Sequence, residues 1–228
     1  MKQDKIWDYY QNKKDKAFVS CSGRLDFVSK FVTNGRVLTI GVGNMYLESL
    51  LINKPGIDLF VLDPSETSIT NARETLNLTV LTSKVGYSQN IPYDDSAFDF
   101  VIMSEVLEHL EDDVLSKTLN EVHRVLDVGG FFIGTVPYNE DLSKSKIICP
   151  NCECVFHKVG HVQSFTKESL IKVIDDVFGV GAAKVKIIFL PAWNILNKRG
   201  KVVAITKKVL EFFGVHSGKS NLFFRVQK

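Results

Sequence analysis

Short apolar runs alternate with segments of helical periodicity between residues 36 and 136. The runs that predict buried strands are Arg36–Ile40, Asp58–Leu62, Phe98–Met103 and Phe131–Val136. The segments between them that predict helices are Met45–Leu51, Ser65–Leu76 and Asp112–Leu126. Strands that alternate with helices favour right-handed crossovers, and hence a mainly parallel sheet with helices on both faces.

The second half of the chain departs from this alternation and then resumes it. Residues 137–164 contain Pro137, Pro150, three of the four cysteines and two histidines, and this composition predicts an insertion. The elements expected after it are a helix at Thr166–Phe178, a strand at Val185–Leu190, a helix at Asn197–Phe213 and a last strand at Asn221–Val226. We expect residues 1–35 to form an N-terminal helical cap on a domain that spans 36–228.

Composition narrows the class of protein. The chain has 228 residues, of which 45% are hydrophobic, so it can bury a substantial core. Its formal charge of +2 makes a nucleic-acid partner unlikely on net charge alone, although it leaves a local basic patch open. The first residues are polar, and no apolar run approaches the roughly 20 residues needed to span a bilayer. We therefore expect a cytoplasmic protein.

Two glycines and an acidic residue stand at the ends of the first two predicted strands. Gly41 and Gly43 follow the first strand, where glycine lets the backbone turn sharply and approach a ligand. Asp63 ends the second strand, where a carboxylate can accept hydrogen bonds from ribose hydroxyls. The alternative is a simple tight turn, with Asp63 capping the next helix. A dinucleotide site is disfavoured, because Tyr46 stands where its third glycine is needed.

Four segments, in this order and spacing, resemble the class I S-adenosylmethionine-dependent methyltransferases of the ubiquinone-biosynthesis type. They are Arg36–Asn44, Phe60–Pro64, Asn90–Leu110 and Glu121–Gly130. The resemblance implies a Rossmann-like, doubly wound α/β fold. Its seven-stranded sheet would be mainly parallel, with helices on both faces and an antiparallel last strand, and it would bind S-adenosylmethionine.

The resemblance also implies a role for particular residues. Those expected around the cofactor are Gly41, Val42 and Gly43 beneath its methionine part, Asp63 at its ribose, Pro64, Ser88 and Gln89 at its adenine, and Ser104 near its methionine part. Arg24 would either pair with the cofactor carboxylate or stand as a solvated surface residue.

Three positions depart from the family's pattern. An acidic residue is usual where Thr39 stands, a third glycine is frequent where Met45 stands, and aspartate is frequent where Tyr87 stands. Each change could weaken cofactor binding. A degenerate relative without catalytic activity, acting as a binding module, is therefore one alternative.

Candidate catalytic chemistry follows the fourth predicted strand. His109 is the candidate general base, although Glu108 and His109 could instead order the start of a helix. Glu105, Glu108 and His109 form E-x-x-E-H, which resembles the magnesium or manganese motif of ubiquinone-pathway O-methyltransferases and of small-RNA 3′-end methyltransferases. A later histidine, here His161, accompanies that motif. The same motif is also widespread in methyltransferases without metal.

The insertion carries a second candidate metal site. Cys149 and Cys152 form a C-x-x-C pair, followed by Cys154, His157 and His161. Thiolates and imidazoles at this spacing suit tetrahedral zinc, with Cys149, Cys152, His157 and His161 as the predicted ligands. The alternative is an acceptor lid with reduced, unliganded thiols. Both metal hypotheses require His161, and we favour zinc.

We expect transfer of a methyl group to the oxygen of a small-molecule, glycan or lipid-linked acceptor. The alternative enzyme is an RNA-directed methyltransferase that uses a divalent metal. The basic helix expected at Asn197–Phe213 could make peripheral contact with an anionic membrane, or could pack on the domain by its apolar face.

Overall fold

The computed structural model describes residues 21–193, 195–214 and 220–228, and within them the predicted α/β fold is confirmed. Seven strands form one sheet in the order β3-β2-β1-β4-β5-β9-β8. Their bounds are β1 Gly35–Ile40, β2 Ile57–Asp63, β3 Ser83–Val85, β4 Phe98–Ser104, β5 Leu126–Pro137, β8 Ala183–Ile188 and β9 Asn221–Gln227. Strand β9 runs antiparallel to both of its neighbours, and the other pairings are parallel.

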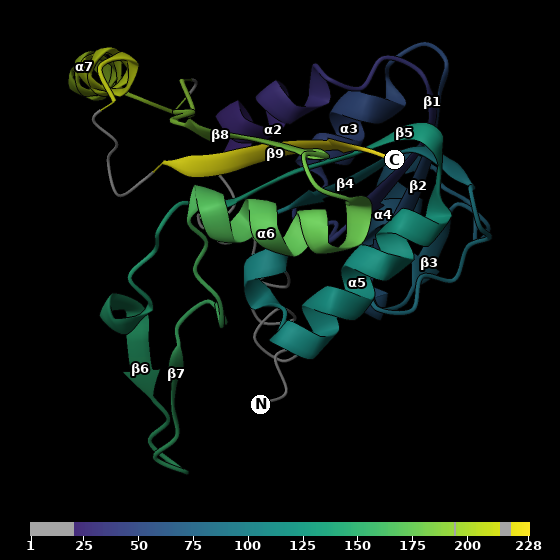
Figure 1. Ribbon diagram of the computed structural model, residues 1–228, viewed down its shortest axis with the longest axis horizontal. Helices are drawn as coiled ribbons and strands as arrows, with labels where there is room; N and C mark the ends of the chain where they lie inside the picture. Colours follow the sequence, from purple (N-terminus) through teal and green to yellow (C-terminus); the bar gives the residue numbers. More distant parts are fainter. Residues whose placement is uncertain (1–20, 194, 215–219) are drawn as a thin grey trace.

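Helices cover both faces of the sheet (Figure 1). Helices α2 (Ser22–Ser29), α3 (Tyr46–Ile52) and α4 (Glu66–Leu76) share one hydrophobic cluster with one face. Helices α5 (Asp112–Val125) and α6 (Lys167–Phe178) share the other cluster. Strand β4 lies between the two clusters and is buried on both sides, which explains its nearly continuous apolar sequence.

Local sequence signals set the helix starts. Ser65 caps α4 by accepting a hydrogen bond from the backbone N–H of Ser68, at 3.3 Å. Thr166 and Ser169 form a capping box at the start of α6. Strand β3 was not predicted, because three residues are too few to show a period. Residues 1–20, which make up most of the predicted N-terminal cap, lie outside the described residues. Helix α2 lies in the part of the cap that the structure describes.

Residues 137–164 leave the sheet as an excursion (Figure 1). The short helix η3 (Leu142–Ser145) leads into a hairpin of β6 (Lys146–Ile148) and β7 (Val155–His157). A bridge between Tyr138 and Phe165 closes its base, so the chain returns to the domain where it left.

Helix α7 (Lys198–Phe212) connects β8 to β9 and stands away from the sheet (Figure 1). Of its side chains that the structure describes, only Ala204 is buried, whereas Val202, Ile205 and Val209 are exposed. The expected alternative, a helix packed by its apolar face, is therefore wrong. Within the described part of the chain, every helix is too short or too polar to cross a bilayer.

Candidate functional site

The glycine turn forms the floor of a pocket at the carboxyl end of β1. Gly41 and Gly43 have φ values of +86° and +54°, a left-handed conformation that glycine adopts without steric cost. A Cβ atom on Gly41 would also lie 2.8 Å from Cγ2 of Val106, so the loop after β4 packs directly on this turn. The turn therefore requires glycine at Gly41 for two independent reasons.

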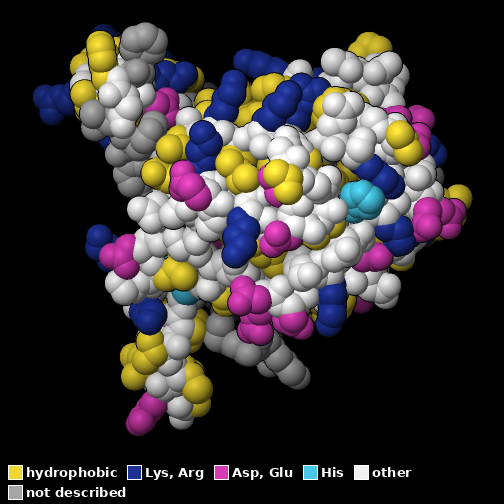
Figure 2. All heavy atoms as spheres, viewed as in Figure 1, with side chains coloured by type: hydrophobic (Ala, Val, Ile, Leu, Met, Phe, Trp, Pro, Cys, Tyr) yellow, Lys and Arg dark blue, Asp and Glu magenta, His cyan; other side chains and the backbone are white. Residues whose placement is uncertain are grey.

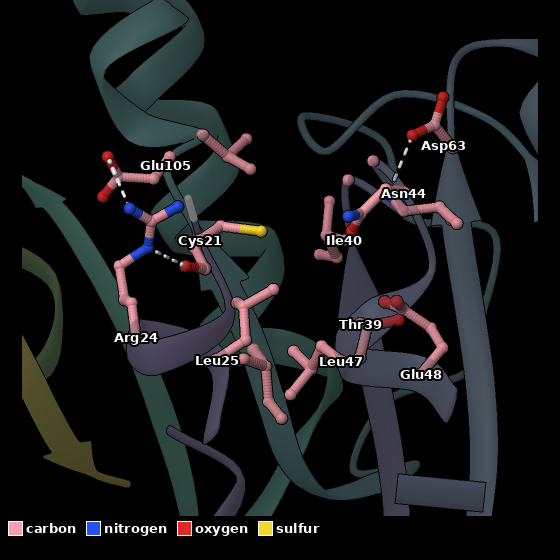
Figure 3. Close-up of a pocket in the computed structure, with 16 residues that line it drawn as sticks. Cys21, Arg24, Leu25, Thr39, Ile40, Asn44, Leu47, Glu48, Asp63 and Glu105 are labelled. Carbon is pink, nitrogen blue, oxygen red and sulfur yellow. Dashed lines mark hydrogen bonds and ion pairs between the residues drawn. The ribbon is translucent and has the colours of Figure 1, made fainter. Parts of the chain in front are cut away.

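Asp63 ties this turn to the end of β2. Its Oδ2 accepts the backbone N–H of Val42 at 2.9 Å, and its Oδ1 accepts that of Ser65 at 2.8 Å. The carboxylate is only 3% exposed and lies at the pocket wall (Figure 3). Each carboxylate oxygen can accept more than one hydrogen bond.

The pocket lies between the ends of β1, β2 and β4 and is closed from the side by α2 (Figure 3). Its free space, including the open mouth, is about 680 Å³. The predicted cofactor residues that line it are Gly41, Val42, Gly43, Asp63 and Ser104. The structure does not place the predicted adenine residues Pro64, Ser88 and Gln89 in its lining. The hydroxyl of Ser88 is instead 2.8 Å from that of Thr118 on α5.

Arg24 of α2 reaches the same pocket and pairs with Glu105. Its guanidinium lies 3.5 Å from Oε2 of Glu105, and its Nε donates to Oγ of Ser104 at 3.3 Å (Figure 3). Glu105 has a left-handed φ of +58° and also accepts from Asn221, at 3.0 Å. Such a backbone conformation is costly for a residue with a side chain and persists only when its surroundings hold it. Arg24 is therefore a pocket residue, and Glu105 is held at the pocket mouth.

A carboxylate that the sequence did not single out, Glu48 of α3, is buried in the pocket wall. It is 2% exposed and lies beside Thr39 (Figure 3). Burial is the main cause that raises its pKa, to about 7. Met45, ahead of it, has a φ of +63°, the conformation that glycine would adopt freely. Two departures from the family's pattern are thus partly offset: Glu48 supplies a carboxylate beside Thr39, and Met45 keeps the backbone of a glycine.

Beyond β4, a buried cluster of acidic and histidine side chains adjoins the pocket. Ligand atoms of Glu108, His109 and His161 lie within 4.8 Å of one another. Both carboxylate oxygens of Glu108 are buried without a hydrogen-bond partner among the described residues, and Nε2 of His161 lies 3.9 Å from one of them. A buried carboxyl without donors favours a proton or a cation at this point. The donor set fits a divalent metal ion.

A second group of ligands shares His161. Ligand atoms of Glu140, His157 and His161 also lie within 4.8 Å of one another. Glu140 and Nδ1 of His161 are 2.5 Å apart, and the rings of His157 and His161 stack at 4.8 Å. The two ring nitrogens of His161 therefore face different carboxylates, Glu140 on one side and Glu108 on the other.

Comparisons with known proteins agree with this arrangement. Residues 38–134 match the methyltransferase-domain family. This match covers less than half of the chain. Two curated relatives are an uncharacterised protein of Methanocaldococcus jannaschii, 26% identical over 144 residues, and the uncharacterised protein YafE of Escherichia coli, 35% identical over 65 residues. The alignments cover 61% and 28% of this chain, and 65% and 30% of the relatives' lengths.

Solved methyltransferases have the same fold as this chain. S-adenosylmethionine-dependent methyltransferases of Thermotoga maritima and Archaeoglobus fulgidus are 20% and 13% identical, each with a TM-score of 0.65. These alignments cover 98% and 99% of the two chains in the first case and 100% of both in the second. A 1,6-didemethyltoxoflavin N1-methyltransferase of Burkholderia thailandensis, with S-adenosylhomocysteine bound, is 12% identical and has a TM-score of 0.65. The alignment covers 99% of this chain and 86% of that chain.

The structure does not bring the predicted zinc-knuckle residues into one ligand group. Among the described residues, none of the candidate ligand groups includes Cys149 or Cys152. Cys149 hydrogen-bonds through its backbone to Cys154 at the hairpin tip, whereas His157 pairs with Lys146 at the hairpin base. Three residues of strand, about 10 Å, therefore lie between the thiols at the tip and His157 at the base.

His109, the predicted catalytic base, is not in the pocket lining. It is 8% exposed, and its ring is 4.6 Å from that of His161. Burial, followed by the charge of His161, lowers its pKa to about 3. At neutral pH His109 is therefore an uncharged imidazole, which is a weak proton acceptor by itself and a suitable metal ligand.

Glu105, the first residue of the E-x-x-E-H motif, belongs to neither candidate ligand group. Its carboxylate accepts from Asn221 and Thr135 and lies beside Arg24. The structure therefore divides the motif: Glu105 lines the pocket, and Glu108 and His109 belong to the histidine cluster.

Proposed function

We propose that this methyltransferase acts on a hydroxyl oxygen of a small-molecule, glycan or lipid-linked acceptor. The buried cluster of Glu108, His109 and His161, directly beyond the cofactor pocket, is the observation that carries the proposal. Methyl transfer from a sulfonium is an in-line displacement, in which the protein mainly positions the acceptor. A hydroxyl must also lose its proton, so it needs a proton acceptor or a charge beside it.

The position of the cluster supports this role. Val106 lines the cofactor pocket, and Glu108 follows two residues later on the short helix η2 (Leu107–His109). The returning end of the excursion donates two backbone N–H groups, from Val162 and Gln163, to the carbonyl oxygen of Glu108. The excursion therefore lies against Glu108, close along the chain to the residue that lines the pocket.

Glu108, His109 and His161 are also the residues that we propose hold a divalent cation such as magnesium or manganese. When bound, such a cation would lower the pKa of the acceptor hydroxyl. Glu140 accepts from Nδ1 of His161 and so fixes the orientation of its ring, as carboxylates that hydrogen-bond to the free nitrogen of a metal-ligating histidine do. The ubiquinone-pathway subtype, the adenine residues Pro64, Ser88 and Gln89, and the cytoplasmic location stay predictions.

The test is a methyl-transfer screen over sugar, lipid and phenol hydroxyl acceptors, with elemental analysis of the same preparation. With the acceptor found, Glu108→Gln should lower the rate by about 100-fold or more, the usual contribution of acid–base chemistry, and leave S-adenosylhomocysteine affinity unchanged. Glu111→Gln is the matched control, because Glu111 is exposed three residues away. It should keep the parental rate.

The outcomes separate the parts of the proposal. Activity of Glu108→Gln equal to that of the parent would remove the cluster from the chemistry. Full activity in chelator would remove the cation and leave the hydroxyl acceptor standing. Transfer to RNA, and to none of the small acceptors, would replace the proposal by the RNA-directed alternative. Failure to bind S-adenosylhomocysteine would favour a degenerate binding module.

A further inference from the structure

Helix α7 turns a row of apolar side chains toward solvent. Val202, Ile205, Val209 and Phe213 recur every three or four residues and therefore share one side of the helix and its C-cap. They are 63%, 55%, 51% and 73% exposed. Ala204, on the opposite side, is 3% exposed. The helix thus rests on the protein by a small residue and presents its larger apolar residues outward.

Basic side chains border this row. Lys198–Phe212 contains five lysine or arginine residues and one glutamate. Lys201 and Lys208 are exposed along one edge of the apolar row, and Arg199 is exposed on its other side. Figure 2 shows Lys and Arg side chains on α7 and along the upper edge of the molecule next to it. The surface therefore pairs an apolar row with positive charge.

We propose that α7 docks on an anionic phospholipid surface. An interfacial helix places apolar side chains at the boundary of the acyl chains and keeps Lys and Arg among the headgroups, and α7 has both parts. Its 15 residues are too few to cross a bilayer, so the helix lies in the plane of the surface. A neutral protein partner would leave the basic border without a counterpart, and this favours the membrane.

The ends of the α7 connection lie at the cofactor pocket. Before the helix, Pro191 packs so closely on α2 that a Cβ on Gly23 would lie 2.4 Å from its carbonyl oxygen. After it, Asn221 donates to Glu105 at the pocket mouth. Asn221 also pairs with Pro137 at the end of β5, so α7 leaves the sheet at the end where the pocket opens. Docking would bring that end toward the membrane, and this part, which rests on the proposed function, selects the lipid-linked acceptor.

The test is flotation of the full-length protein with two kinds of vesicle, pure phosphatidylcholine and an equal mixture of phosphatidylcholine and phosphatidylglycerol. The protein should float with the anionic vesicles and be released by salt. The triple variant Val202→Gln/Ile205→Gln/Val209→Gln should bind the anionic vesicles at least about tenfold more weakly, because it loses the apolar area that the helix would bury in the membrane. Lys201→Gln/Lys208→Gln should weaken binding by a similar factor. Glutamine keeps helix propensity, and circular dichroism checks the helix.

The matched controls are Val128→Gln and Val180→Gln, at apolar positions that are 83% and 99% exposed outside α7. They should float like the parent. Equal binding to both kinds of vesicle, or no binding to either, would overturn the proposal. So would concentration-dependent dimerisation that the triple variant abolishes, because a second copy would then cover the helix. Binding of S-adenosylhomocysteine, measured in parallel without vesicles, tests the proposed methyltransferase site. Its loss would count against the proposed function and not against membrane docking.

Discussion

Asp63 holds the glycine turn and is the predicted ribose ligand, and a pair of substitutions can test that prediction. Asp63→Ala removes the acceptor for the backbone N–H of Val42 and the predicted acceptor for ribose hydroxyls. Hydrogen bonds to a charged group contribute about 1.5–3 kcal/mol each, so the affinity for S-adenosylhomocysteine should fall by about 100-fold or more. Asp63→Asn keeps one oxygen acceptor and should lose less. Calorimetric titration measures both, and a parental affinity in Asp63→Ala would show that the ribose lies elsewhere.

Without cofactor, the buried carboxyl of Glu48 should make the protein less stable at high pH. Its folded pKa is about 7 against the ordinary 4.5, so between these values the unfolded chain releases a proton that the folded protein retains. Stability therefore falls as pH rises through this window, by about 3 kcal/mol in all. Glu48→Gln keeps the shape and removes the charge. In urea unfolding it should match the parent at about pH 4 and exceed it at about pH 8. If the variant and the parent were equally stable at both pH values, Glu48 would have to lie in a solvated site with an ordinary pKa.

What the sequence could predict at the level of single residues was what adjoins a strand end. Gly41, Gly43 and Asp63 directly follow or end a strand, and the edge of a parallel sheet brings such positions together without further information. Glu48 could not be found this way, because its place depends on how α3 turns after the left-handed Met45. A glutamate between Leu47 and Leu51 on a buried face was the only signal for it.

Strand pairing explains why the predicted zinc residues do not lie together. Spacing along a chain does not show which residues a hairpin places at its tip and which at its base. Pairing of Lys146 with His157 puts the histidine at the base, beside Glu140. The sequence could not show that neighbour of His157 and His161, because Glu140 lies outside the cysteine motif.

The cysteines at the hairpin tip and the histidines near its base can be compared by substituting each set separately. Substituting Cys149, Cys152 and Cys154 by serine should leave metal content and melting temperature unchanged, because the thiols take no part in the candidate ligand groups. His161→Asn should lower metal content, since both groups use that residue. Elemental analysis and thermal unfolding measure the two effects. Loss of metal from the serine variant would restore the cysteines as ligands.

The fold itself was largely predictable, because most strands of the sheet are apolar runs and most helices show a helical period. The family's order of strands followed from the resemblance. The position of α7 was not predictable. Its helical period predicts one apolar face. The sequence does not show whether the domain covers that face, because this depends on where the helix stands relative to β8 and β9. Solvent-exposed Val202 and Ile205 are the result.

Cofactor binding should protect the sheet end and leave the hairpin unaffected. S-adenosylhomocysteine at about 100 times its dissociation constant adds about 2.7 kcal/mol, or roughly 5–10 °C in melting temperature for a protein of this size. In hydrogen exchange, amides of residues 41–48 and 63–65 should slow, since they form the pocket wall and its ties. Amides of 146–157 should not, because the hairpin pairs only within itself and joins the domain at its base. Protection of the hairpin by S-adenosylhomocysteine alone would mean that the excursion closes over the cofactor and not over the acceptor.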